Sequence, residues 1–248
     1  MIDTTAHEGY YFFVRKLFYF ALVFAFFLFP ETANAGLVVV KQSGEVIVNV
    51  LSVQDGEGVE MTEEPLETLN LSDTLISLST KDERSYLSLG LPEGDRVLDV
   101  TDYGDDILEV EGETARQKLT ISKKENKFSI LQDGLIVITD YEITIDPGGK
   151  KLLVATPTGK KYLLVFPQEA ALSLLRSNLV TKIEKEKEIN MSESEGDLAY
   201  EIVGKKFFEF FGVFGFDVDV ATLVSATNGQ VLSVTSPGWM RAFSSVLI

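Results

Sequence analysis

Short apolar runs separated by turn-forming residues dominate the chain from residue 36 to about residue 167. The runs are rich in β-branched residues, and Gly, Asp, Asn and Pro lie between them, which is typical of antiparallel strands. In one run Leu87 and Leu89 alternate with Tyr86 and Ser88, so we expect one buried strand face and one wetter face. The predicted strands are residues 37–41, 45–53, 74–79, 85–90, 97–101, 107–110 and 118–122, and the Glu-rich stretch 55–67 is predicted to be a linker or long loop.

Turn signals are clearest between residues 128 and 166. An Asp-Pro-Gly-Gly sequence at 146–149 separates the run 136–145 from the run 151–156, and a Thr-Pro-Thr-Gly sequence at 156–159 separates that run from 161–166. Pro and Gly supply turn dihedrals that β-branched residues resist. We therefore predict a meander of consecutive antiparallel strands in this segment.

The pattern changes from strand to helix at Pro167. Pro at a first helical position, an early Glu169 and helix-forming residues predict a helix over 167–176. Leu172, Leu175 and Leu179 fall at helical spacing, which predicts that they face a sheet. Strand-like runs follow at 198–211, 214–225 and 230–235, with an Asn-Gly turn signal before the last. The predicted class is α+β and strand-dominated, with an antiparallel β-rich domain over 36–166 and a helix-plus-antiparallel-meander module over 167–248.

Residues 1–35 have the pattern of an export signal. Arg15 and Lys16 precede the apolar run 17–29, Pro30 ends it, and Ala33 and Ala35 are the small residues that signal peptidase requires. The apolar run is shorter than the roughly 20 residues that cross a bilayer as a helix. We expect a cleaved signal and a secreted or extracytoplasmic protein. The alternative is an uncleaved signal anchor, and only then would the protein be attached to a membrane.

The mature chain would be strongly acidic and would contain neither His nor Cys. The full chain has 22 Lys and Arg against 38 Asp and Glu, and its single histidine, His7, lies in the predicted signal. Nucleic-acid binding needs clustered basic residues, so we expect no nucleic-acid partner. Histidine- or cysteine-based nucleophiles and zinc sites are excluded as well. The remaining catalytic options are carboxylate pairs, Lys or Tyr bases, or a metal held only by oxygen, and a hydrolase of that kind is the enzyme alternative. The sequence shows no such site in a cleft, so we predict no enzyme activity, no catalytic residue, no metal and no cofactor.

Two groups of carboxylates are candidate sites. Asp217 and Asp219 share one strand face, which would allow paired acids in a glycosidase, but the polar face of an amphipathic strand is the simpler interpretation. A second group could supply oxygen ligands for calcium, although it lacks EF-hand spacing, and solvated turn residues are the expected alternative. That group is Asp95, Asp99, Asp102, Asp105 and Asp106.

Aromatic side chains gather near the C-terminus. They would form either sheet core beneath the predicted helix or a hydrophobic edge that binds an extended peptide by strand addition. The apolar tail from Trp239 to Ile248 would either dock onto the body or mediate association. The candidate binding residues are Phe207, Phe208, Phe210, Phe211, Phe214, Phe216 and Trp239.

The last third of the chain resembles a PepSY or PepSY-like domain. The resemblance rests on Tyr200-Glu201-Ile202-Val203-Gly204 and on the segment 224–234, which contains Ala-Thr-Asn-Gly-Gln-Val. Ser225 and Asn228 stand where the family pattern has Asp and Thr. PepSY domains are exported or membrane-associated modules linked to peptidase inhibition or peptide binding, so the resemblance implies a bacterial envelope location and assigns no catalytic residue.

These observations predict an exported, non-catalytic binding protein that recognises or inhibits an extended polypeptide or a peptidase. The expected surface is the aromatic segment from Phe207 to Phe216 together with the sheet formed by residues 204–235. The alternative is a structural cell-surface or envelope protein that self-associates through its apolar C-terminal tail.

Overall fold

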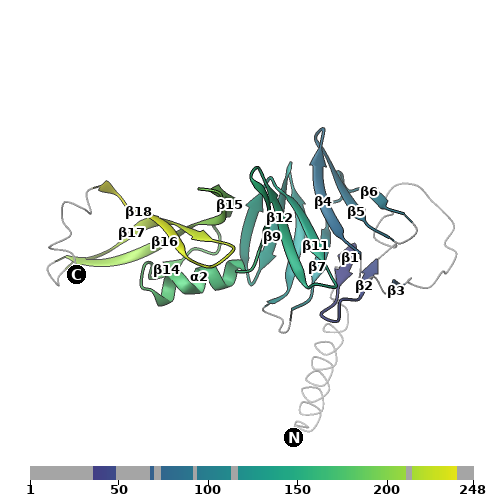
Figure 1. Cartoon of the computed structure of the whole chain (residues 1–248). Coiled ribbons are helices and arrows are strands. Elements are labelled where there is room, and N and C mark those ends of the chain that lie inside the picture. The colour runs from purple at the N-terminus through teal and green to yellow at the C-terminus, as the bar shows by residue number, and fades with distance from the viewer. Residues whose placement is uncertain are drawn as a thin grey trace, which may run out of the picture. The chain divides into compact units, whose positions relative to one another are not determined.

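A computed structural model describes residues 36–48, 68–69, 74–91, 94–112, 117–210 and 214–238. The chain divides into two compact units, residues 1–34 and 35–248, and all described residues lie in the second. The predicted export signal at 1–35 and the predicted loop at 55–67 lie outside them. Of the described residues, 58% are in strands and 7% are helical. The strands form two large sheets, coloured from purple to yellow along the chain in Figure 1.

The first sheet has 12 strands in the order β18-β17-β16-β15-β10-β9-β8-β7-β1-β2-β3, and β14 also pairs with β16. Two pairs are parallel, β1 with β7 and β10 with β15, and the others are antiparallel. The bounds are β1 (Val38–Val40), β2 (Val46–Val48), β3 (Thr68–Leu69), β7 (Asp106–Val110), β8 (Leu119–Lys124), β9 (Lys127–Gln132), β10 (Leu135–Thr139), β14 (Lys182–Ile183), β15 (Ile189–Ser194), β16 (Asp197–Phe210), β17 (Phe214–Ser225) and β18 (Val231–Thr235).

The second sheet has six antiparallel strands in the order β13-β12-β11-β4-β5-β6. The predicted run 136–145 is divided between the sheets, because β10 belongs to the first sheet and β11 to the second. The predicted meander is therefore confirmed for β11, β12 and β13, which pair consecutively across the two predicted turns, but it does not extend back to residue 128 as one sheet. The bounds are β4 (Ile76–Lys81), β5 (Arg84–Leu89), β6 (Arg96–Asp99), β11 (Glu142–Asp146), β12 (Lys151–Thr156) and β13 (Gly159–Tyr162).

The two sheets share one hydrophobic core. Leu87 and Leu89 of the second sheet are buried while Tyr86 and Ser88 are half-buried, which confirms the predicted alternation. Leu119 and Ile121 of the first sheet belong to the same continuous cluster of buried residues. Strands β4, β5 and β12 bury alternate side chains, as expected when one strand face meets a partner and the other meets solvent, whereas β8 to β11 bury up to three consecutive residues.

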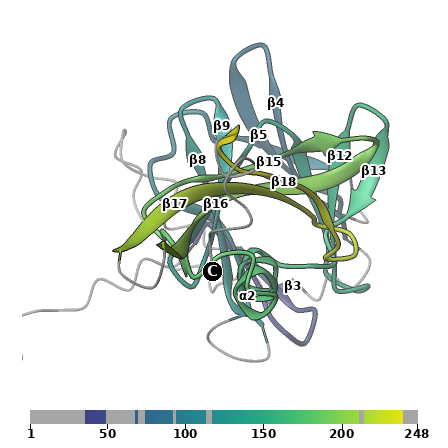
Figure 2. The same ribbon diagram turned by 90° about the vertical axis from the view of Figure 1, so that its left-hand side faces the viewer.

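Helix α2 (Pro167–Arg176) begins at the predicted proline. The backbone N–H of Phe166 donates to Glu169 Oε2 at 3.4 Å, so the acidic residue of the first turn satisfies a donor at the helix start. The helix contacts β10, β14 and β16 and lies beneath the curved strands β16–β18 in Figure 2. It buries Ala170, Ala171 and Leu174, whereas Leu172 and Leu175 are exposed. The prediction that these two leucines face the sheet is therefore wrong.

The predicted α+β class is also wrong, because the described residues are mainly β and contain one α-helix. The helix and the last strands do not form a separate helix-plus-meander module. Strand β15 pairs in parallel with β10, with Val137 opposite Ile189, so the C-terminal strands extend the first sheet. Parallel partners are distant in sequence and leave no local turn signal. The predicted domain boundary at residue 167 stays a prediction.

Candidate functional site

The long hairpin of β16 and β17 carries most of the predicted binding residues. Its register runs from Ala199 opposite Ser225 to Phe210 opposite Phe214. A strand of 14 residues is roughly 46 Å long, whereas a helix of 10 residues is roughly 15 Å long. The helix therefore covers only part of the hairpin. We call residues 206–209 and 214–218, which lie beyond the helix, the distal hairpin.

Contacts with the C-terminal end of α2 mark where this cover stops. Lys206 Nζ donates to the backbone carbonyl of Asn178 and, at 2.9 Å, to its Oδ1. Tyr200 and Gly204 lie on the same face of β16 as Lys206, by period-2 alternation. A Cβ atom added at Gly204 would lie only 2.7 Å from Val180 Cγ1, so glycine allows the segment after the helix to approach the strand.

The predicted phenylalanines divide between the two faces of the distal hairpin. Phe208 and Phe216 lie directly opposite each other on β16 and β17, and both are half-buried, with ring centroids 6.4 Å apart. They are on the hairpin face that α2 covers nearer to the base of the hairpin. Phe207 lies on the other face, over Gly215, and is 49% exposed. Phe214 is 70% exposed. The side chain of Phe210, all of Phe211 and Trp239, and the rest of the apolar tail lie outside the described residues.

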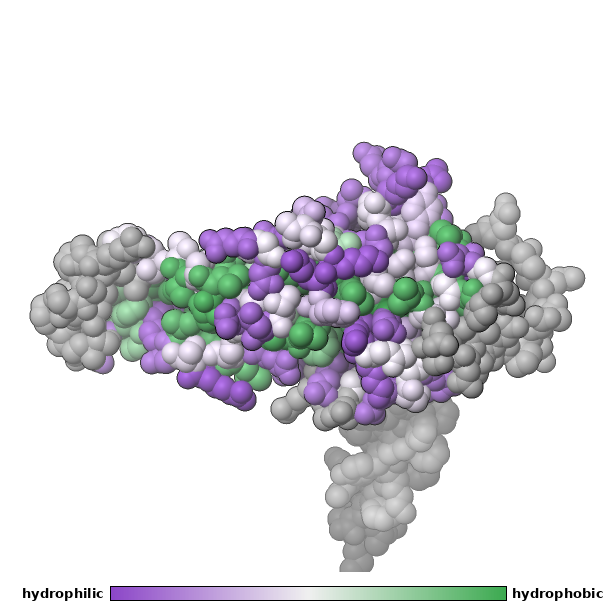
Figure 3. Space-filling view, viewed as in Figure 1, coloured by the Kyte–Doolittle hydropathy of each residue, from purple (hydrophilic) through white to green (hydrophobic). Residues whose placement is uncertain are grey.

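Strand β18 ends the first sheet next to this hairpin. Among the described residues it pairs only with β17, and all five of its side chains are exposed and uncharged. One strand edge therefore presents backbone donors and acceptors without a described partner. Figure 3 shows hydrophobic side chains gathered where β16–β18 and α2 lie. Besides Phe207 and Phe214, the exposed large apolar residues of these elements are Leu172, Leu175, Val231, Leu232 and Val234.

Two sets of partly buried polar contacts hold the base of the hairpin. Asp197 accepts hydrogen bonds from Ser225 Oγ at 2.6 Å and from Thr227 Oγ1 at 2.8 Å. Burial opposes ionisation of Asp197, but these hydroxyls and the Leu198 N–H outweigh it and lower the pKa of the carboxyl group. Tyr200 is fully buried and its hydroxyl donates to the Val165 carbonyl at 2.9 Å. Burial raises the pKa of Tyr200, with a smaller contribution from the charge of Glu169.

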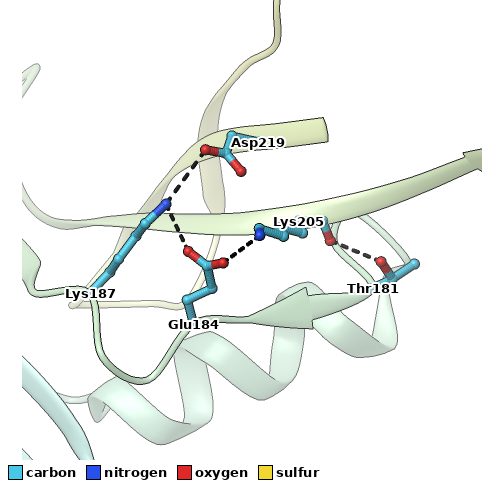
Figure 4. Close-up of polar contacts among 5 residues, drawn as sticks. All are labelled: Thr181, Glu184, Lys187, Lys205 and Asp219. Carbon is cyan, nitrogen blue, oxygen red and sulfur yellow. Dashed lines mark hydrogen bonds and ion pairs between the residues drawn. The ribbon is translucent and has the colours of Figure 1, made fainter. Parts of the chain in front are cut away.

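An ion-pair network links the loop after β14 to the other face of the hairpin (Figure 4). Glu184 lies 2.7 Å from Lys187 Nζ and 2.7 Å from Lys205 Nζ, and Lys187 lies 3.5 Å from Asp219. Hydrogen bonds from Lys187 and Lys205 lower the pKa of Glu184 to about 2. Thr181 adds a link, because its Oγ1 donates to the Lys205 carbonyl at 2.9 Å.

The remaining carboxylates of the distal hairpin lie near Phe207. Asp217 is opposite Phe207 in the register, and it shares a strand face with Asp219, as predicted. Among the described residues, Asp217 and Glu209 have no ion pair, so the hairpin presents unpaired negative charge beside exposed aromatic rings. The described residues contain no group of three or more acidic side chains arranged to hold a metal ion. In the predicted calcium group, Asp99 pairs with Arg84 at 3.5 Å.

Comparison with known proteins adds no relative. No family model matches the chain, and neither a curated protein nor a solved structure matches it. The resemblance to PepSY domains therefore stays a prediction. Within the described ranges, no helix has the length and apolar character to cross a bilayer.

Sequence reasoning did not single out the β18 edge or the network around Glu184. The edge had a signal, since residues 231–235 form a short apolar strand without charge after a turn. The network had none, because Glu184 and Asp219 are brought together only by the pairing of β14 with β16 and of β16 with β17.

Proposed function

We propose that the protein is an exported, non-catalytic binding protein that adds an extended polypeptide to the edge of β18. The observation that carries the proposal is a terminal sheet strand with an open edge beside exposed apolar side chains. A peptide that lies along such an edge gains backbone hydrogen bonds, and alternate side chains contact the neighbouring surface. Phe207 and Phe214, further along the hairpin that β18 joins, supply additional aromatic contact area.

The charge of the surface favours a basic and apolar polypeptide. The chain has 16 more acidic than basic residues, and Asp217 and Glu209 carry unpaired charge on the distal hairpin. Alternating Lys and Val side chains in a peptide strand would place charge on one side and apolar groups on the other. An exported polypeptide or peptidase with such a segment is the proposed partner class.

The test is a fluorescence anisotropy titration of the purified protein with a labelled nine-residue peptide of alternating Lys and Val. We expect saturable binding that weakens with added salt. A peptide of the same sequence, with alternate backbone amides N-methylated, keeps its charge but loses strand hydrogen bonds, so its binding should be abolished. Equal binding of both peptides would refute strand addition. Failure of both peptides to bind, together with concentration-dependent self-association, would favour the assembly alternative.

A matched pair of variants locates the site. Phe207→Ser removes an exposed aromatic ring of the distal hairpin and should weaken binding about fivefold or more, the usual effect of losing an aromatic anchor. Val97→Ser removes a 59%-exposed apolar side chain from β6, an edge strand of the second sheet, and should leave the affinity unchanged. Equal affinities of the two variants would exclude a contribution of the distal hairpin to peptide binding at the β18 edge.

A further inference from the structure

A cavity of about 370 Å³ opens between the two sheets, away from the distal hairpin. Its walls are apolar and come from both sheets: Val40, Val110 and Leu119 from the first, Ile145 and Leu152 from the second, and Phe166 before α2. This volume falls in the lower part of the range of small-molecule sites, roughly 300–1,000 Å³, which are typically apolar with a few placed polar groups. The cavity therefore has the size and lining of a ligand site.

Two turns, one from each sheet, meet beside the cavity. Gly44, in the turn between β1 and β2, has a φ of +88°, and a Cβ added there would lie 3.1 Å from the carbonyl oxygen of Pro147, in the turn between β11 and β12. Lys41 comes from the first turn, Lys150 comes from the second, and Lys151 begins β12 directly after it. The close approach at Gly44 thus brings lysines from two sheets to one cavity.

The lysines give the cavity lining a cationic side in an otherwise acidic chain. Lys41 is half-buried, and among the described residues neither Lys41 nor Lys150 has an ion pair. Lys151 Nζ lies 5.4 Å from the centre of the Tyr162 ring. Asp146 also lines the cavity, but its Oδ1 already accepts the Gly149 N–H at 2.8 Å. Glu111 is the other acidic residue in the lining, which therefore contains three lysines and two carboxylates, and the Lys151 ammonium lies by the Tyr162 ring outside that lining.

We propose that this cavity binds a small amphipathic anion, with its apolar chain between the sheets and its carboxylate at Lys41 and Lys150. The apolar walls would bind the hydrocarbon chain of the ligand, because removal of that chain from water is favourable. The ammonium groups would bind the carboxylate head group of the ligand, because charge-assisted hydrogen bonds to a carboxylate are stronger than neutral ones. This site is separate from the β18 edge, so it stands or fails independently of the proposed polypeptide binding.

The test is isothermal titration calorimetry of the purified protein with sodium decanoate below its micelle concentration. We expect one saturable site for decanoate and at least about tenfold weaker binding of decanol and of decyltrimethylammonium, which keep the chain but lose the anionic head. Absence of a binding isotherm with decanoate would overturn the proposal. Equal affinities for the anionic and cationic amphiphiles would overturn the assigned role of the lysines.

Surface variants assign the head group. Lys41→Gln combined with Lys150→Gln should weaken decanoate binding about tenfold or more while leaving the melting temperature of the free protein unchanged, since neither ammonium group has a described ion pair. The matched control is Lys160→Gln, an exposed residue of β13 outside the cavity, which should bind decanoate as the parent does. An unchanged affinity in the double variant would place the anion elsewhere.

Discussion

Replacement of Gly204 by alanine tests the close approach that supports the hairpin. An added Cβ would lie 2.7 Å from Cγ1 and 2.9 Å from Cβ of Val180, and 3.0 Å from the carbonyl oxygen of Lys182. Overpacking of this kind costs about 1–3 kcal/mol. Alanine also restricts the unfolded chain, which offsets about 0.4–1 kcal/mol. The expected net loss in free energy of unfolding is therefore about 1–2 kcal/mol.

Urea and thermal unfolding followed by circular dichroism measure this loss. A loss of that size corresponds to a fall of about 2–8 °C in melting temperature for a chain of this length. Gly104→Ala is the matched control, because no atom lies within 4 Å of an added Cβ and its φ is not in the left-handed region. It should be neutral or stabilising by up to about 1 kcal/mol. Equal stabilities of the two variants would refute the reasoning.

A double variant separates the two sources of strain. Val180→Ala shortens the side chain that meets the new Cβ but leaves the Lys182 carbonyl in place. The combined cost of Gly204→Ala and Val180→Ala should therefore be smaller than the sum of the single costs, by about 0.5 kcal/mol or more. Additive costs would mean that the two residues do not share the same space.

The other predictions concern polar contacts around the hairpin. Tyr200→Phe keeps the buried ring but removes the hydrogen bond to the Val165 carbonyl, so urea unfolding should show a loss of about 1 kcal/mol. Unchanged stability would mean that this bond contributes nothing. The pKa of Glu184 is lowered from 4.5 to about 2, so its ion pairs stabilise the fold above pH 4.5 and are lost as the pH falls towards 2. Glu184→Gln should therefore lower the melting temperature at pH 7. It should also reduce the fall in melting temperature that the parent protein shows between pH 4.5 and pH 2, whereas an unchanged fall would contradict a stabilising role of the Glu184 ion pairs.

Part of the candidate site could be predicted from local pattern. The aromatic segment was found from composition, and period-2 alternation already places Phe207 and Phe208 on opposite strand faces. What covers each face could not be predicted. Phe208 lies beyond the end of α2 because β16 is longer than the helix, and strand length is set by pairing with β17 along its whole course.

The sequence by itself determined the local elements of this protein. Pro, Gly and Asp at 146–149 define a turn, and Pro167 starts a helix, because these residues restrict their own backbone dihedrals. Alternation determined that Leu87 and Leu89 would be buried together, since neighbouring side chains in a strand point to opposite faces.

Only the tertiary structure decided how these elements combine. The parallel pairing of β10 with β15 joins the C-terminal strands to the first sheet, and burial of Ala170 and Leu174 instead of Leu172 sets the rotation of α2. The cavity between the sheets arises in the same way, from two turns that meet at Gly44. Such contacts join residues far apart in the chain, and the choice among alternative partners depends on the packing of the whole core.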